Sequence, residues 1–310
     1  MKKLGKLLFT FGLILILTGV VILRKDSIMT LFNTYLSPNS NKVEVEEVND
    51  YYRDYDFLFI QNTKLINPLE YQDILNTYYT VINAGYNEFT FYCPKEYESC
   101  LTDVESIAND QTLLSDINNY THPFNAFSHI ETEFDSLGKV TIKITRPYTK
   151  KDIKDINNEV DKLYDELYDS KLSIESNIVK FHDYIINYTK YDSLRSDKNI
   201  TTYRSDIAYG PLFEGYAVCG GYTDLMQLFL EKMNVKSYRV SSNSHIWNAV
   251  YLDGEWYHLD LTWDDPVVSD GKDYLNHDYF LIKTKELQEK EKTQHEFNKK
   301  RFLEVKEANS

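Results

Sequence analysis

Basic residues are scarce in this sequence. Lysine and arginine together number 34 against 48 aspartate and glutamate residues, which gives a formal net charge of -14. A protein that binds nucleic-acid phosphates needs an electropositive stripe, and none is visible, so we expect no nucleic-acid partner. An acidic surface instead favours encounter with basic partners, including partners that carry amines.

Recognisable metal-binding motifs are missing as well. The sequence has no D-x-D-x-D-G calcium loop, no H-x-x-x-H pair and no second pair of cysteines. His122 and His129 have no second ligand at metal spacing, and His182 stands beside an apolar helical stripe, so we interpret all three as packing or surface residues. We therefore expect no metal and no organic cofactor. Internal repeats and low-complexity tracts are also absent.

An apolar run, residues 7–23, follows three lysines and precedes two basic residues near the N-terminus. At a rise of 1.5 Å per residue, a helix of this length reaches about 25 Å, enough to cross a bilayer core. The run ends without a small-x-small cleavage site, which favours an uncleaved signal anchor in residues 1–25 over a cleaved signal peptide. The slight excess of positive charge before the run predicts a single-pass membrane protein with an extracytoplasmic body. Secretion after cleavage is the alternative.

Local patterns divide the remaining chain. Residues 87–93 and 127–146 have strand signals, the latter with a turn at Asp135 to Gly138, and residues 97–110 have helical spacing. Apolar residues at three- and four-residue steps predict helices in residues 149–190, with Ser173 and Ser176 as capping residues. We expect a linker (26–50), a small α+β module (51–148), a connecting helix (149–171), a catalytic domain (172–285) and a charged, solvated tail (286–310).

Three cysteines occur in the chain. Cys93 and Cys100 lie seven positions apart, and an extracytoplasmic location permits a disulfide between them; two separate reduced thiols are equally compatible with the sequence. Cys219 is left over under either interpretation. It is a buried thiol, a metal ligand or a nucleophile.

The surroundings of Cys219, "YAVCGGYTDLM", predict the start of a buried helix. If Gly220 and Gly221 form the first turn, the helix dipole stabilises a thiolate at Cys219, and backbone N–H groups such as that of Gly220 receive an oxyanion. The two glycines would also let a substrate backbone come close. Capping of the helix by Thr223 is the alternative, which would leave Cys219 in an ordinary loop.

A hairpin follows around the turn Asp253-Gly254. A two-residue turn pairs positions whose numbers sum to 507, so His245, Trp247 and Asp260 share one face, and the imidazole and the carboxylate are diagonal neighbours. A carboxylate in this position orients the base of a nucleophile–base–orienter triad. A register slip of one residue would separate the pair.

Two other interpretations compete with this triad. His258 shares the face of Asp260, but it has no separate carboxylate aimed at it, so we prefer His245 as the base. Zinc held by Cys219, His245 and Asp260 would lack any further ligand pattern.

Three blocks carry a family resemblance: "GYAVCGGY", "HIWNAV" and "WYHLD", with "KFHDYIINYTKYD" and "AYGPLFEGYAVC" upstream. Together they resemble the transglutaminase-like superfamily, over residues 172–285. The resemblance implies an α+β, papain-like fold, with the nucleophile on a helix and the base and orienter on antiparallel strands. In this chain those residues are Cys219, His245 and Asp260.

The resemblance also implies a reaction. The thiol attacks an amide, in a glutamine side chain or a peptide bond of a protein at the cell surface, and the thioester passes its acyl group to an amine or to water. Papain-like enzymes use a glutamine before the cysteine as second oxyanion donor; Phe213 stands there, so Tyr209 or Trp247 is the substitute we consider. A non-catalytic peptide- or glycan-binding module, and a wall-peptide amidase or cysteine protease, are the rival functions.

Overall fold

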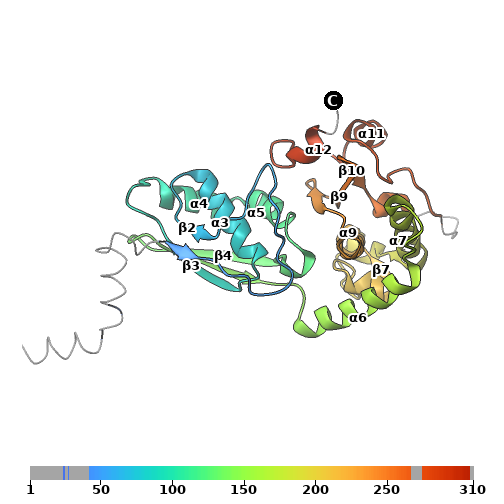
Figure 1. Cartoon of the computed structure of the whole chain (residues 1–310), viewed down its shortest axis with the longest axis horizontal. Coiled ribbons are helices and arrows are strands. Elements are labelled where there is room, and N and C mark those ends of the chain that lie inside the picture. The colour runs from blue at the N-terminus through green and yellow to red at the C-terminus, as the bar shows by residue number, and fades with distance from the viewer. Residues whose placement is uncertain (1–23, 25–26, 28–41, 267–273, 308–310) are drawn as a thin grey trace, which may run out of the picture.

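The computed structural model describes residues 42–266 and 274–307, together with Arg24 and Ser27. Apart from Arg24 and Ser27, these residues form two lobes, of which the first contains residues 42–148 and the second residues 149–266 and 274–307 (Figure 1). Within the described ranges, no helix is both long and apolar enough to cross a membrane. The apolar run of residues 7–23 lies outside those ranges, so the signal anchor stays a prediction.

The first lobe is an antiparallel sheet covered on one face by helices (Figure 1). The sheet has the strand order β3-β5-β4, and the strands at 88–92, 129–134 and 139–145 confirm those predicted in this region. The helix predicted in residues 97–110 is also present. The elements are β1 (Val43–Glu44), β2 (Leu65–Ile66), α3 (Tyr71–Asn83), β3 (Glu88–Tyr92), α4 (Cys100–Asn109), α5 (Gln111–Asn118), the 3₁₀ turn η1 (Pro123–Asn125), β4 (His129–Phe134) and β5 (Lys139–Thr145).

The second lobe places helices around a three-stranded antiparallel sheet of order β10-β9-β8. Helices α6 and α7 confirm the two predicted from apolar spacing, and Ser173 caps α7 by accepting a hydrogen bond from Ser176 N. The elements are α6 (Lys150–Leu167), α7 (Ile174–Tyr188), β6 (Lys190–Tyr191), α8 (Ser193–Lys198), the π-helical turn η2 (Gly210–Glu214), β7 (Tyr216–Ala217), α9 (Cys219–Lys232), β8 (Ser237–Ser241), β9 (Ile246–Leu252), β10 (Glu255–Leu259), α10 (Leu261–Asp264), α11 (Thr284–Lys290) and α12 (Leu303–Glu307).

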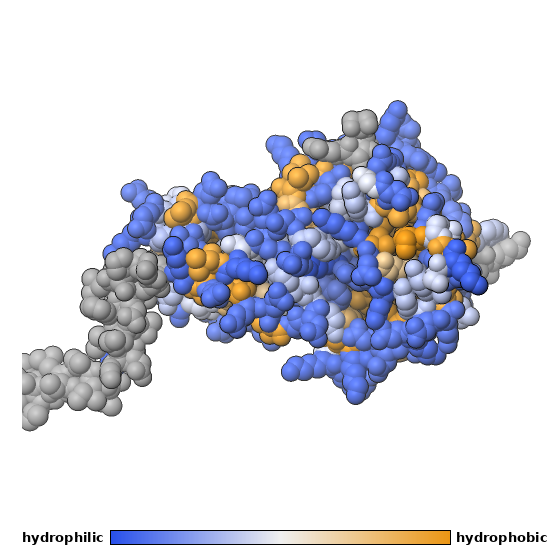
Figure 2. Space-filling model, in the orientation of Figure 1, coloured by the Kyte–Doolittle hydropathy of each residue, from blue (hydrophilic) through white to orange (hydrophobic). Residues whose placement is uncertain are grey.

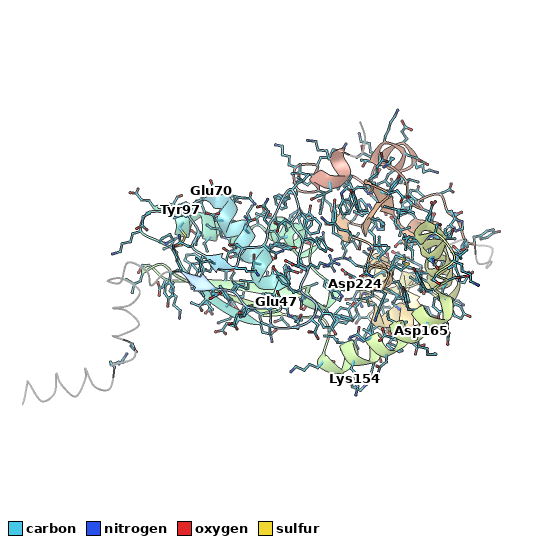
Figure 3. The ribbon with its side chains drawn as sticks, in the orientation of Figure 1. Glu47, Glu70, Tyr97, Lys154, Asp165 and Asp224 are labelled. Carbon is cyan, nitrogen blue, oxygen red and sulfur yellow. A yellow bond between two sulfur atoms is a disulfide. The ribbon has the colours of Figure 1, made fainter. Side chains whose placement is uncertain are left out.

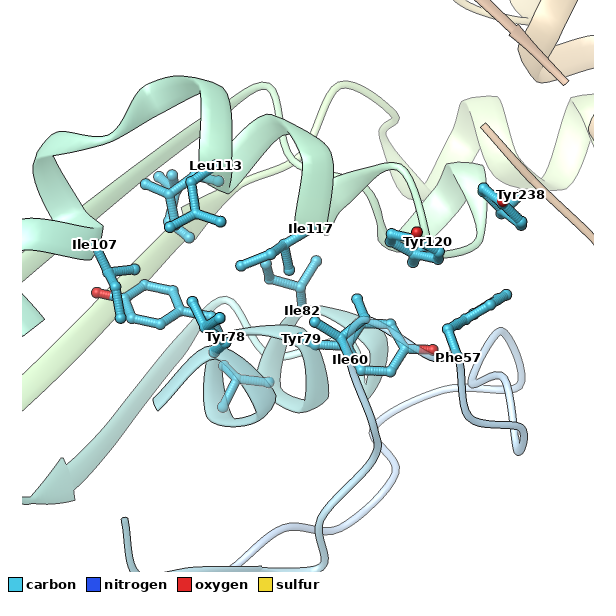
Figure 4. Packing of buried hydrophobic residues seen from close by; sticks show 14 of the residues in the cluster. Phe57, Ile60, Tyr78, Tyr79, Ile82, Ile107, Leu113, Ile117, Tyr120 and Tyr238 are labelled. Atoms are coloured by element: carbon cyan, nitrogen blue, oxygen red, sulfur yellow. The ribbon is translucent and has the colours of Figure 1, made fainter. Parts of the chain in front are cut away.

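Aromatic side chains join the two lobes into one hydrophobic cluster. Figure 4 shows Tyr120 of the first lobe beside Tyr238 of β8, with Phe57 below them. The rings of Tyr120 and Tyr238 stack at 4.7 Å, and Phe57 meets Tyr238 edge-on at 5.3 Å. The small module of residues 51–148 therefore has no separate hydrophobic core: its buried side chains pack together with those of β8 and β9, and β9 begins directly after His245.

Charged groups also cross this junction. Arg53 forms an ion pair with Glu231 of α9 and donates to Ser237 O at 3.2 Å. Asp224, labelled in Figure 3, lies in α9 and accepts hydrogen bonds from Tyr148 Oη at 2.6 Å and from Arg239 at 2.9 Å. Because Arg53, Asp224 and Arg239 are buried, removing a partner would leave an uncompensated buried charge. The contacts fix α9, whose first residue is Cys219, against its surroundings.

The C-terminal segment is not the solvated tail that its charge predicted. His295, Phe302 and Val305 are fully buried, and Leu287 and Phe297 lie in the cluster shared by the two lobes. Most of the charged residues between them face water, although Glu304 is buried and accepts a hydrogen bond from Leu58 N, while the widely spaced apolar residues face inward. An overall charge count misses this arrangement because it averages over both faces.

The surface agrees with the acidic composition. Hydrophilic side chains dominate the face shown in Figure 2, with smaller hydrophobic patches, one of them over the second lobe. Glu47, Glu70 and Asp165 are among the exposed carboxylates (Figure 3). In the first lobe Cys93 and Cys100 form a disulfide, with their Cα atoms 5.7 Å apart, the pairing that the sequence left open.

Candidate active site

Cys219 is the first residue of α9, as the glycine pattern predicted. Val218 precedes the helix in extended conformation, and its carbonyl accepts from the N–H groups of Gly221 and Tyr222. Within the described part of the chain, the N–H groups of Cys219 and Gly220 have no acceptor. The thiol therefore sits beside free backbone donors at the positive end of a helix, where a thiolate is stabilised.

The structure rules out the alternative in which Thr223 caps the helix, since α9 begins at Cys219 and Val218 precedes it. The Thr223 hydroxyl donates to Ile246 O at 3.0 Å, and Asn248 Nδ2 donates to Thr223 O at 3.1 Å. Both bonds join α9 to β9, one turn after Cys219 and directly after His245. They set the position of the helix that carries the thiol relative to the strand that follows the imidazole.

The two glycines after Cys219 have a different role from the one expected. A Cβ atom on Gly220 would lie 2.6 Å from Asp206 O, and one on Gly221 would lie 2.3 Å from Ser205 O. Glycine is needed there because the protein's own approach loop, rather than a substrate, lies against the helix start. Val218 N donates to Ser205 O at 2.8 Å and so fixes this loop beside the thiol.

The hairpin has the predicted register. Glu255 pairs with Leu252 and Leu259 with Asn248, so the paired numbers sum to 507. Asp253 and Gly254 have φ of 51° and 89°, the left-handed values that a two-residue type I′ turn requires. The ladder stops at Leu259, since Asp260 N donates to Tyr279 O and the chain turns into α10. The pairing of Asp260 with Trp247 is therefore absent, but the ring of Trp247 still stacks on that of His245 at 5.6 Å.

His245 and Asp260 meet directly. The distance from His245 Nε2 to Asp260 Oδ2 is 2.5 Å, and both side chains are buried. Asp260 Oδ1 accepts from the N–H groups of Thr262 and Trp263 at 3.0 and 3.2 Å, which fixes the carboxylate at the start of α10. Because Nε2 faces Asp260, Nδ1 is the nitrogen left to interact with Cys219.

Electrostatics favour a charged imidazole at this position. Burial lowers the pKa of His245, but the charge and hydrogen bond of Asp260, together with its interaction with Cys219, raise it to about 10. Burial raises the pKa of Asp260, yet His245 and His295 hold it well below its usual range. The site thus favours an imidazolium between a carboxylate and the thiol, the state in which a cysteine is most reactive.

His295 is a member of the site that the sequence analysis missed. Its side chain is fully buried, and its Nε2 lies 2.9 Å from Asp260 Oδ2, the same oxygen that His245 contacts. Its ring stacks on Tyr279 at 5.5 Å. No local motif marks this histidine, because it lies 35 residues after Asp260 in a segment of charged composition.

Tyr191 was also missed. Tyr191 of β6 pairs with Ala217, two residues before Cys219, and burial raises the pKa of its phenol. Its hydroxyl donates to Ser196 at 3.2 Å. The short parallel pairing of β6 with β7 brings it near the start of α9, since β7 ends one residue before Val218.

The structure places the remaining candidates away from catalysis. Trp247 donates its indole N–H to His258 Nδ1 at 2.8 Å, so this group is not available to an oxyanion. His258 is buried and forms a hydrogen bond with the Thr284 hydroxyl. Burial lowers the pKa of His258 to about 3, which supports the choice of His245 as base. Tyr209 packs under Arg204, whose Cζ lies 4.2 Å from the ring centroid, and against Phe213.

Three donor atoms of the site lie close enough to suggest a metal. They belong to His245, Asp260 and His295 and lie within 4.8 Å of one another. All three side chains are buried, however, and the raised pKa of His245 favours its protonated form. A coordinating imidazole must be deprotonated. These residues fit a hydrogen-bonded cluster better than a metal site.

Comparison with known proteins gives only weak similarities for this chain. No protein-family model and no curated protein matches this chain. A solved transglutaminase (TGase) structure is similar over 44% of this chain and 45% of its own length, with 16% identity and a TM-score of 0.33. A candidate cysteine protease from Cytophaga hutchinsonii is similar over 47% of this chain and 65% of its own, with 14% identity and a TM-score of 0.27. The functional assignment therefore rests on the geometry of the site.

Proposed function

We propose that the protein is a transglutaminase-like thiol enzyme that attacks an amide through Cys219, His245 and Asp260. One observation carries the proposal: a cysteine at a helix N-terminus lies beside an imidazole whose far nitrogen is held by a buried carboxylate. A thiolate–imidazolium pair of this kind is nucleophilic near neutral pH.

The reaction follows from the positions of these groups. The thiolate of Cys219 attacks the amide carbonyl carbon, and the N–H groups of Cys219 and Gly220 stabilise the resulting oxyanion. The imidazolium of His245 then gives its proton to the leaving nitrogen as the C–N bond breaks, which leaves a thioester. An amine or water attacks the thioester and passes a proton to His245, and the Cys219 thiolate departs.

The acceptor decides between cross-linking, deamidation and proteolysis. We propose transfer to an amine, because the acidic surface favours encounter with cationic amines. The test is incubation of the full chain with a glutamine-containing peptide and a labelled primary amine. Incorporation of the amine supports acyl transfer. Ammonia release alone supports deamidation, and peptide cleavage supports the rival amidase or protease.

The remaining rival is a non-catalytic module that binds peptide or glycan. It predicts peptide binding with none of the three products, in wild type and in the Cys219→Ala variant alike. Loss of all products in Cys219→Ala, when wild type forms one of them, excludes this rival.

We further propose an extracytoplasmic location, with the run of residues 7–23 as anchor. Protease added to intact cells should then digest the body of the protein. Protection in intact cells combined with digestion after lysis would contradict this location.

A further inference from the structure

A second group of histidines and carboxylates lies outside the active site, where α7 meets the segment that precedes Tyr279. It consists of His182, Asp183 and His277, and we refer to it as the surface cluster. His182 Nδ1 lies 2.8 Å from Asp183 Oδ1, and His277 Nε2 lies 2.7 Å from the same oxygen. The three donor atoms lie within 4.8 Å of one another.

The far side of His182 has the environment of a metal-binding histidine. Its Nε2 lies 3.1 Å from Asp264 Oδ2, and both side chains are fully buried. Asp264 is itself held in place, because its Oδ1 accepts from Tyr279 N at 2.9 Å. Histidines that bind metals almost always donate their second N–H to such a group, which orients the ring. With Nε2 held by Asp264, Nδ1 is the nitrogen that faces Asp183 Oδ1, 2.8 Å away, and it is the one available to a metal.

From this arrangement we propose that the surface cluster binds a divalent transition-metal ion, with Zn²⁺ the best match. Two imidazoles and one carboxylate suit Zn²⁺ and its first-row neighbours, whereas Ca²⁺ and Mg²⁺ prefer sets of oxygen ligands. Three protein ligands leave a further position for water.

A metal ion can enter the surface cluster if the ligand side chains move by small distances. Zinc about 2.0–2.2 Å from each ligand sets the ligand atoms roughly 3.3–3.5 Å apart, so the shortest separations must widen by about 0.6 Å. His277 and Asp183 can make this adjustment, because their side chains are 43% and 33% exposed. His182 is fixed by burial and by Asp264 and supplies the rigid part of the site.

The position of the site indicates what the ion would do. Asp264 is the last residue of α10, and Asp260 immediately precedes that helix. Asp260 N also donates to Tyr279 O at 3.1 Å, in the segment that follows His277. A metal at the surface cluster would tie α7 to this segment behind Asp260. Its expected effect is on stability, since none of its ligands contacts Cys219 or His245 within the described part of the chain.

Equilibrium dialysis of the metal-stripped full chain against Zn²⁺ tests the proposal, in a Cys219→Ser background that removes the free thiol. We expect about one ion per chain near neutral pH. His277→Ala should weaken binding at least tenfold, and Asp264→Asn by roughly 10–100-fold, as expected for an outer partner. The matched control is His129→Ala, which alters an exposed histidine of β4 and should bind as tightly as the parent.

A thermal measurement separates binding from misfolding. Zn²⁺ should raise the melting temperature of the parent and of His129→Ala, but not that of His277→Ala. Failure of the parent to bind Zn²⁺ would overturn the proposal, as would binding that His277→Ala leaves unchanged. Binding lost in His295→Gln but kept in His277→Ala would move the metal to the active site and equally overturn it. None of these outcomes depends on whether the proposed amide chemistry occurs.

Discussion

Two clusters of the same residue types lie near the two ends of α10, and they differ in what surrounds them. The active-site cluster (His245, Asp260 and His295) is buried, and both imidazoles direct Nε2 at one carboxylate oxygen next to a thiol. The surface cluster also has two imidazoles around one carboxylate oxygen, but it is partly exposed. If the surface cluster binds a metal and the active-site cluster moves protons, as we propose, then burial and neighbours decide between the two roles more than residue type does.

The largest difference between the clusters should appear in turnover. His245→Ala removes the base, and we expect kcat/KM for amine incorporation to fall by about 10³-fold or more, as for other members of such triads. His277→Ala alters the surface cluster alone and should change kcat/KM less than about threefold, a small effect on the free-energy scale. Steady-state kinetics on both variants check this, and an equal loss in both would break the distinction.

The pH dependence of stability should also separate the clusters. Burial lowers the pKa of His245, but Asp260 and Cys219 raise it to about 10, above the ordinary 6.5. The imidazolium therefore stabilises the fold fully below pH 6.5, and this contribution disappears as the pH rises through 10. The free energy of unfolding should fall over that interval by up to a few kcal/mol more in wild type than in His245→Gln.

Urea unfolding at several pH values measures this difference, with His277→Gln as the control for the surface cluster. In this control the free energy of unfolding should change with pH as steeply as in wild type. If the free energy of unfolding changes equally with pH in wild type and in His245→Gln, the charged imidazole does not contribute to stability.

Substitutions of His295, the second histidine of the active-site cluster, test whether it positions the carboxylate of Asp260. His295→Leu removes the hydrogen bond to a buried, charged carboxylate, worth about 1.5–3 kcal/mol, so kcat should fall roughly 10–100-fold with little change in KM. His295→Gln can retain a donor and should restore part of the rate. A fold that melts normally and a kcat unchanged in His295→Leu would contradict this role.

The smallest predicted effect concerns Gly220, where the loop before Cys219 packs against the start of α9. Gly220→Ala places a methyl group 2.6 Å from Asp206 O, so we expect a loss of stability of about 1–3 kcal/mol and slower alkylation of Cys219. Gly254→Ala is the control, because it adds local strain at a turn with no atom within 4 Å of the new group. It should leave the alkylation rate unchanged, and equal rates in both variants would argue against the steric account.

Residues close together in the chain were predictable, because turn chemistry and strand alternation fix their positions. Asp253 and Gly254 set the register that brings His245 to Asp260, and the glycines after Cys219 mark the start of α9. His295 was not predictable, since its contact with Asp260 depends on how a distant segment packs. The role of Gly220 also needed the structure, which identifies the neighbouring atom as Asp206 O.

The most direct test of the central claim is the alkylation rate of Cys219 by iodoacetamide as a function of pH, in wild type and in His245→Ala. If His245 holds a proton beside a thiolate, Cys219 of wild type should react rapidly below neutral pH, and the variant should lose this reactivity. Reaction that becomes appreciable only near about pH 8.5 in both proteins, as for an ordinary thiol, would contradict the claim.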